Sequence, residues 1–358
     1  MSVNRRILSC FVVVALLLVV AGCDADWVDI FGSSNNNNDS NRDNTSVVAD
    51  TDVAGLAVAV SDNNFTATQQ ALVTAVDNRQ SSIGAPQALA IALQTQANSA
   101  LNASNGNGGV LPGNTMTGTG GNNANLNVRP TQVLLYSNPS QGTPILNADP
   151  RAGLDLPPAL LVYQDSENSV GVAYDSAAYY RARYDVADAD DALDALQQDA
   201  RSLAEAAAGS DVSVDGDADD IRRGQGIVSR DSNDDFNTTL ARLINAIGDD
   251  NSLELITQVD QRQAALGAGL MLGNNDNQST LVLFDGGANS ARLLASGQTL
   301  GIDLPLRMLV SEADNGDVTV YYNAPDYLAT RHQIDNRDNA RDDLADTLSD
   351  LADVATGN

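Results

Sequence analysis

The pentapeptide GLDLP at Gly153–Pro157 returns almost unchanged as GIDLP at Gly301–Pro305. The offset of 148 residues between them holds without a gap through the flanking sequence, so that Arg183, for example, aligns with Arg331. Self-similarity at a fixed spacing is typical of a repeated structural unit. We therefore predict that the chain contains a duplicated domain.

The front halves of the two repeats also align, but at a larger offset. GLAVAV begins at Gly55 and its counterpart GIVSRD begins at Gly226, an offset of 171 residues. The first repeat therefore carries 23 extra residues, the difference between the two offsets, and a Gly- and Asn-rich stretch at about 104–123 accounts for them as a loop. The predicted organisation is a first domain at 51–208, an acidic linker at 209–225 and a second domain at 226–358.

Each repeat shows the same order of predicted elements. An apolar strand (56–60 and 227–229) leads into a helix with apolar residues at helical spacing, and a second apolar strand (133–136 and 281–284) precedes the pentapeptide. A hairpin follows, for which Asn315-Gly316 supplies the left-handed turn in the second repeat, and a helix closes the repeat. Strands joined by hairpins, with helices at the ends, indicate an α+β fold in which helices cover one face of an antiparallel sheet.

The first 50 residues are predicted to bring the protein to a membrane. Arg5 and Arg6 precede the apolar run Ile7–Val20, which is short for a membrane span and typical of a signal peptide. The run ends in VAGC, which resembles the lipobox of bacterial lipoproteins and makes Cys23 the expected lipidated residue. An ordinary signal peptide or a short membrane helix is the alternative. We predict a signal peptide at 1–22, a solvated tether at 23–50, and a place in the bacterial cell envelope, on the periplasmic side of the inner or outer membrane.

Charge and rare residue types exclude several functions. Asp and Glu number 47 against 19 basic residues, and the net charge of -28 repels the phosphates of nucleic acids. Of the two cysteines, Cys10 would leave with the signal peptide and Cys23 would carry lipid, so thiolate chemistry is not expected. A single histidine gives little scope for a histidine-based metal site or a catalytic triad. The sequence predicts no cofactor, no metal and no catalytic residue.

Two segments resemble DUF302, a domain family of unknown function. They are RPTQVLLYSNPSQGTPILNADPRAGLDLPPALLVYQD at Arg129–Asp165 and GIDLPLRMLVSEADNGDVTVYYNAPDYLATRHQI at Gly301–Ile334. The resemblance implies two tandem two-layer domains, each a curved antiparallel sheet with helices on one face, in a topology similar to the TATA-binding-protein fold. It does not imply DNA binding, because fold is not function and the charge is of the wrong sign. Family members often carry an Asp-His pair after the middle strand, where this sequence reads Asp260-Gln261 and, in the first repeat, Gln94-Thr95.

The polar residues near the repeated motif have a structural and a functional interpretation. His332 is interpreted as a hydrogen-bonded surface residue at a domain edge. Asp155 and Asp303, which precede Leu-Pro in the two pentapeptides, are interpreted as caps of neighbouring backbone amides. Arg183 and Arg331 either bind a carboxylate ligand or hold Asp155 and Asp303 across the fold, and the second interpretation is favoured.

Two further features are ambiguous. Tyr174 and Tyr322 at strand ends are more typical of core or sheet-edge residues than of ligand-binding residues. The segment DGDADD at Asp215–Asp220 resembles the start of a calcium loop, but Asp220 and Gly226 stand where such a loop needs Gly and Glu, so we interpret it as a solvated linker. The residues that could line a ligand site are Asp155, Tyr174, Arg183, Asp303, Tyr322, Arg331 and His332.

These observations favour a membrane-anchored, non-enzymatic module that binds a small ligand or an envelope protein on its sheet faces or between its domains. One alternative is an enzyme that uses Asp303, Tyr322, Arg331 and His332 of the second domain. Another is a purely structural envelope protein. We also expect the two domains to pack on each other as an intramolecular pseudo-dimer.

Overall fold

The computed structural model describes residues 52–83, 85, 88–104 and 126–358. The predicted signal peptide, Cys23, the tether and the predicted insertion beyond Ser104 lie outside the described residues. Both repeats belong to one compact unit, Thr45–Asn358. Within the part of the chain that the structure describes, no helix combines the length and the apolar character needed to cross a membrane.

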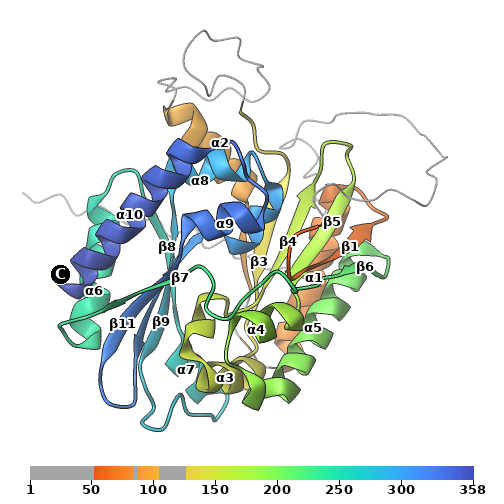
Figure 1. Ribbon diagram of the computed structural model, residues 1–358. Coiled ribbons are helices and arrows are strands. Elements are labelled where there is room, and N and C mark those ends of the chain that lie inside the picture. The colour runs from red at the N-terminus through yellow and green to blue at the C-terminus, as the bar shows by residue number, and fades with distance from the viewer. Residues whose placement is uncertain (1–51, 84, 86–87, 105–125) are drawn as a thin grey trace, which may run out of the picture. The chain divides into compact units, whose positions relative to one another are not determined.

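The first repeat forms a six-stranded antiparallel sheet with the strand order β2-β3-β4-β5-β1-β6 (Figure 1). Helices and short 3₁₀ turns, labelled η, connect the strands. In chain order the elements are β1 (Leu56–Ser61), α1 (Phe65–Ile83), β2 (Leu89–Ile91), α2 (Leu93–Ser104), β3 (Thr131–Leu135), α3 (Pro139–Ala148), η1 (Pro150–Leu154), β4 (Ala159–Gln164), β5 (Val170–Asp175), α4 (Ala177–Arg183), η2 (Ala187–Ala189), α5 (Asp190–Ala208) and β6 (Val212–Asp215).

The second repeat forms a five-stranded antiparallel sheet with the order β7-β11-β10-β9-β8. Its elements are β7 (Ile227–Asp231), α6 (Phe236–Asp249), β8 (Glu254–Asp260), α7 (Gln261–Gly267), β9 (Ser279–Asp285), α8 (Gly287–Leu294), η3 (Gln298–Asp303), β10 (Leu306–Glu312), β11 (Val318–Asn323), α9 (Pro325–Arg331) and α10 (Asp338–Thr356). When β7 to β11 are matched to β1 to β5, the two sheets have the same strand order except for β6. The predicted α+β class with two antiparallel sheets is confirmed.

The same local signals start the first helix of each repeat. The Ser61 hydroxyl lies 2.7 Å from that of Thr68, and the Ser232 hydroxyl lies 2.6 Å from that of Thr239, so each serine ties the end of a strand to the first turns of the next helix. The predicted hairpin of the second repeat is also present, and Gly316 in its turn has a φ of 87°. Sequence and local structure therefore agree at these element ends.

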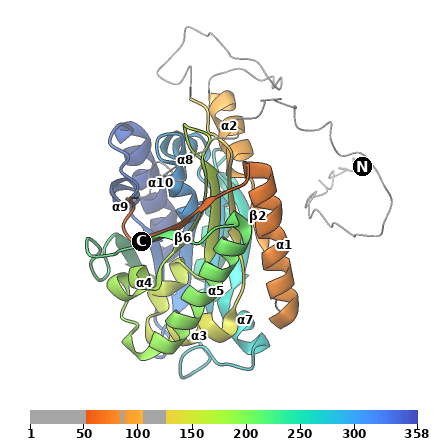
Figure 2. The same cartoon turned by 90° about the vertical axis from the view of Figure 1, so that its right-hand side faces the viewer.

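Each sheet has two buried faces, because successive residues of a strand point to opposite sides. In β4, Leu160 and Val162 pack with residues of α1 and α5, whereas Leu161 and Tyr163 belong to a core cluster that continues into the second repeat. Figures 1 and 2 show α1 and α5 outside the first sheet, and Figure 1 shows α6 and α10 outside the second. Each repeat thus covers one sheet face with its own helices, as expected, but the two remaining faces are buried together instead of being open to a ligand.

The predicted acidic linker at 209–225 differs from expectation, because part of it is a strand. β6 pairs with β1 and extends the first sheet by one strand. Its valines, Val212 and Val214, are half-buried and alternate with exposed Ser213 and Asp215, which is the period of a strand with one solvated face. The run of acidic residues in this segment hid that alternation.

Candidate functional site

The repeated pentapeptides lie where the two repeats meet. The 3₁₀ turn η1, which contains Gly153, contacts strands of the second sheet, and η3, which contains Gly301, contacts strands of the first sheet. A Cβ atom on Gly153 would lie 2.7 Å from the Gln261 amide oxygen, and one on Gly301 would lie 2.7 Å from Leu161 Cδ1. Because real Cβ atoms do not approach that closely, both positions need glycine for the repeats to pack.

This packing corrects the alignment of the position where the family often carries an Asp-His pair. Gly301 of the second repeat packs against Leu93, just as Gly153 of the first packs against Gln261. The counterpart of Asp260-Gln261 in the first repeat is therefore Ala92-Leu93 rather than Gln94-Thr95. The Gln261 amide nitrogen donates to the carbonyl oxygens of Gly153 and Leu156, so it serves to join the repeats.

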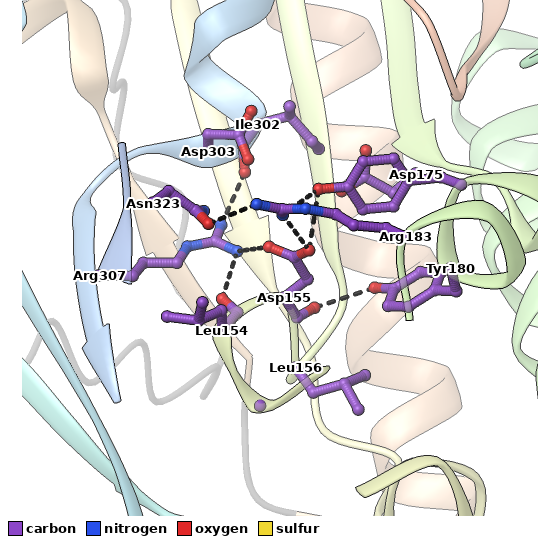
Figure 3. A network of polar contacts seen from close by, with 12 residues as sticks. Leu154, Asp155, Leu156, Asp175, Tyr180, Arg183, Ile302, Asp303, Arg307 and Asn323 are labelled. Carbon is purple, nitrogen blue, oxygen red and sulfur yellow. Dashed lines mark hydrogen bonds and ion pairs between the residues drawn. The ribbon is translucent and has the colours of Figure 1, made fainter. Parts of the chain in front are cut away.

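Arg183 joins the first repeat to the second. Its Nη1 donates to Asp155 of the same repeat at 2.9 Å, and its Nη2 donates to the Asn323 side-chain oxygen of the other repeat at 2.7 Å (Figure 3). Its Nε donates to the Gln225 carbonyl at 3.2 Å. The residue is completely buried, and its guanidinium also stacks over the ring of Tyr327 from the second repeat.

Arg331 makes the matching set of contacts in the opposite direction. Its Nη1 donates to Asp303 of its own repeat at 3.1 Å, its Nη2 to Asp175 of the first repeat, and its Nε to the Ala54 carbonyl at 3.1 Å. Its guanidinium lies over the ring of Tyr179 from the first repeat. Two buried arginines related by the duplication thus tie the repeats together, which is the structural interpretation that the sequence favoured for Arg183 and Arg331.

The interpretation of Asp155 and Asp303 as backbone caps is wrong. One carboxylate oxygen of Asp155 accepts hydrogen bonds from the hydroxyls of Tyr179 and Tyr184 as well as from Arg183. Side chains distant in sequence supply these donors, and helix α4 and the residue that follows it bring them together. Local sequence suggested a turn cap because it does not show which helix folds back over the pentapeptide.

His332 is buried rather than at the surface. Its Nε2 lies 2.7 Å from Asp303, and its Nδ1 lies 3.0 Å from the Thr299 hydroxyl. Tyr184 takes the equivalent place in the first repeat and donates its hydroxyl proton to Asp155. An imidazole and a phenol therefore perform the same task, namely to hold a buried carboxylate beside an arginine.

Thr299, His332 and Asp303 form a hydrogen-bonded row of a hydroxyl, an imidazole and a carboxylate, which are the groups of a catalytic triad. Unlike the nucleophile of such a triad, the hydroxyl here is not accessible to a substrate. All three side chains are buried, and Thr299 has no exposed surface. Burial alone would raise the pKa of Asp303, but Arg331 and the hydrogen bond from His332 hold that pKa well below its usual range. Because a carboxylate neutralised by an arginine is a weak base and no substrate can reach it, we assign these residues a structural role.

The pKa of Asp175 is shifted in the opposite direction from that of Asp303. Burial raises its pKa to about 6, against the attraction of Arg331, and the nearby carboxylate of Asp303 contributes to the rise. The second repeat has the neutral Asn323 at the corresponding position. Arg331 thus contacts two carboxylates, whereas Arg183 contacts one carboxylate and one amide.

Three members of the cluster were not predicted from the sequence, namely Asp175, Asn323 and Arg307. Arg307 Nη2 donates to the Ile302 carbonyl at 2.6 Å, and its Nη1 donates to the Leu154 carbonyl at 3.2 Å and lies 3.8 Å from Asp155 (Figure 3). Arg307 could have been identified from the sequence, because it is a charged residue within the otherwise apolar strand LRMLV.

Tyr174 and Tyr322 do not join the other candidate residues. Each side chain lies on the sheet face that the repeat's own helices cover: the Tyr174 hydroxyl accepts a hydrogen bond from Gln197 of α5, and the Tyr322 side chain is hydrogen-bonded to Ser349 of α10. Burial raises the pKa of Tyr174 to about 12. The structure therefore brings together Asp155, Arg183, Asp303, Arg331 and His332, and it places the two tyrosines apart as core residues.

A cleft of about 500 Å³ opens beside this cluster, at the junction of the two repeats. The lining includes Val53 and Ala54 of the first repeat, Tyr327 and Arg331 of the second, and residues 216, 217 and 219–221 between the repeats. Its volume falls in the range of small-molecule sites. Among the described residues, no three His, Cys, Asp or Glu side chains are placed to hold a metal ion.

Comparison with known proteins gives a family but no activity. The model of the family "Domain of unknown function DUF302" matches residues 99–203 and 228–352, together more than half of the chain. Curated relatives include Fluoride-specific ion channel FluC 1 of Brucella suis biovar 1 (strain 1330) and FluC 2 of Brucella melitensis biotype 1. Each is 31% identical over 109 residues, which are 30% of this chain and 41% and 38% of the two relatives, so the chain spans less than half the length of the curated relatives it matches.

A solved structure is also similar. It is described as an uncharacterized conserved protein DUF302 from Bacillus stearothermophilus, and the match covers 98% of that chain and 37% of this one. The sequence identity is 17% and the TM-score is 0.33.

Proposed function

This chain belongs to the DUF302 family, a domain of unknown function, and we propose that it is a membrane-anchored envelope lipoprotein that binds a small ligand in the cleft between its repeats. The observation that carries the proposal is that residues of both repeats line one cleft of about 500 Å³. In this proposal the two repeats act as a pseudo-dimer, since the contacts of Arg183 and Arg331 support a fixed arrangement of the cleft walls.

A binding role agrees with the chemistry around the cleft better than an enzymatic one. Arg331 reaches the cleft, but all three of its donor nitrogens are occupied by Ala54, Asp175 and Asp303. His332 and Asp303 are buried behind it. An arginine held by three partners suits a fixed wall for ligand recognition, whereas catalysis requires a group that is free to exchange a proton or to attack.

Ligand binding is tested by filling the cleft. Thr330→Trp places an indole on α9 where Thr330 lines the cleft, and Thr347→Trp on α10 is its matched control, since both threonine hydroxyls donate to the carbonyl four residues earlier. The low-molecular-weight extract of the producing cells should raise the Tm of the wild type and of the control but not that of Thr330→Trp, because a ligand that binds only the native state stabilises it. A rise of equal size in all three proteins would mean that the ligand binds outside the cleft, and no rise in the wild type would favour the structural alternative.

The anchor is tested separately at Cys23. Cys23→Ser removes the thiol that lipid would occupy, so the variant should leave the detergent-soluble membrane fraction and show no acyl mass, whereas Cys10→Ser should behave as the wild type. Membrane retention of the Cys23→Ser variant would contradict the lipoprotein proposal and favour a membrane helix. The apolar run that this experiment concerns lies outside the described residues.

A further inference from the structure

The rim of the cleft carries negative charge that the protein does not neutralise. Asp52, Asp217, Asp219 and Asp220 line the cleft, and all four are exposed. None of them forms an ion pair within the described residues, although arginine–carboxylate pairs are frequent elsewhere on this surface. Like charges gathered around a concave surface raise the local concentration of cations.

The inner wall of the cleft carries no unbalanced positive charge that would repel a cation. The positive charge of Arg331 is balanced by Asp303 and Asp175, which both contact it. Tyr327 also lines the cleft: the guanidinium of Arg183 lies over its ring, and its buried hydroxyl has no hydrogen-bond partner among the described residues. An unpaired hydroxyl oxygen can accept a hydrogen bond from an ammonium group.

The spacing of the carboxylates distinguishes between kinds of cation. Among the described residues, no three acidic groups lie close enough together to hold one metal ion, so these carboxylates do not form a compact ion site. Val53, Val214 and Ile221 provide apolar surface between them. A ligand that fits this pattern carries separate positive charges on an apolar chain.

We propose that the ligand of the cleft is an extended organic cation of the polyamine class, with its ammonium groups at Asp52, Asp217, Asp219 and Asp220 and its methylene chain against Val53, Val214 and Ile221. This inference rests on the proposed function, because it names the ligand of the same cleft. It also assigns a role to three acidic residues of the segment Asp215–Asp220, which resembles the start of a calcium loop but which we interpreted from the sequence as a solvated linker.

Calorimetric titration of spermidine into the full chain in detergent, at physiological salt, tests the inference. We expect saturable binding of one spermidine per chain. Asp217→Asn with Asp219→Asn should weaken its Kd by about 5- to 20-fold, since each substitution removes one partly exposed charge pair while keeping the side-chain oxygen that accepts the Asp219 backbone N–H. Asp346→Asn with Asp350→Asn removes the same charge from the exposed face of α10 and should change the Kd less than 2-fold.

Three outcomes would overturn the inference. Equal weakening by the two double variants would show that spermidine binds to the overall negative charge of the protein. Displacement of spermidine by an equimolar amount of Ca²⁺ would show an ion site. Absence of spermidine binding, combined with a Tm increase by cell extract that Thr330→Trp abolishes, would remove the polyamine assignment and leave the binding cleft in place; loss of both signals would remove both.

Discussion

Arg183→Met is expected to lower the free energy of unfolding by about 3–5 kcal/mol, the usual cost of removing one partner from a buried ion pair. The substitution leaves the buried carboxylate of Asp155 with Tyr179 and Tyr184 as hydrogen-bond donors, and Arg307 Nη1 lies no closer than 3.8 Å. It also removes the bond to Asn323 that crosses between the repeats. Urea denaturation followed by circular dichroism measures the loss.

The matched control is Arg201→Met. Arg201 pairs with Glu205 at 2.9 Å on the surface of α5, where its side chain is 42% exposed. An exposed helical pair of this kind contributes little to stability, because water and salt screen it. Arg183→Lys should lie between the two, because lysine keeps the charge but lacks the planar set of donors that reaches three partners at once. A loss for Arg183→Met no larger than that for Arg201→Met would refute the view that the arginines hold the repeats together.

The effect of Arg183→Met should extend beyond its own repeat. Arg183 contacts Gln225, which precedes β7, and Asn323, the last residue of β11, at one end of this antiparallel strand pair of the second repeat. One core cluster also runs through both repeats. Hydrogen exchange should therefore show reduced protection in β11 as well as in β5. Reduced protection confined to the first repeat would mean that the two repeats unfold independently.

The duplication, the class of fold and the family were accessible from sequence because they depend on local patterns. The repeated pentapeptide, the alternation in the strands and the turn at Asn315-Gly316 are all encoded within short windows. Both hairpins and the closing helices occur as predicted. The match to DUF302 in two regions confirms the tandem resemblance that Gly153–Pro157 and Gly301–Pro305 first suggested.

The candidate site was less accessible because it is made by contacts between the repeats. Nothing adjacent to His332 in the sequence shows that η3 carries Asp303 to its imidazole, so a surface position was the reasonable prediction. In the same way, Asp175 and Asn323 end their strands like ordinary polar residues until Arg331 and Arg183 reach them from the other repeat. The two arginines were predictable as partners of the pentapeptide acids, but their second partners required the arrangement of the sheets.

The asymmetry between Asp175 and Asn323 leads to the second large effect. Asn323 shows that an amide can fill this position, since its oxygen accepts from Arg183 at 2.7 Å. Asp175 instead adds a second carboxylate to Arg331 and has a pKa of about 6 in the folded protein, above its ordinary value of 3.8. Ionisation of Asp175 is therefore less favourable in the folded state than in the unfolded chain.

The sign of the pH dependence follows from that difference. A carboxyl whose folded pKa is raised contributes stability that is fully present below about pH 3.8 and is lost as the pH rises through about 6. Asp175→Asn removes this loss. Between about pH 4 and pH 7 the variant should therefore gain roughly 1–3 kcal/mol of unfolding free energy relative to the wild type. The lowered pKa of Asp303 acts in the opposite direction, at lower pH, and is common to both proteins.

Urea denaturation of both proteins at several pH values between about 4 and 7 measures this difference directly. Asp346→Asn, on the exposed face of α10, removes an equal charge and should run parallel to the wild type over the whole range. A constant difference between the wild type and Asp175→Asn would mean that Asp175 is as easily ionised in the folded protein as in water. In that case Arg331 would fully compensate both of its carboxylates, and the neutral residue of the second repeat would offer no advantage to the first.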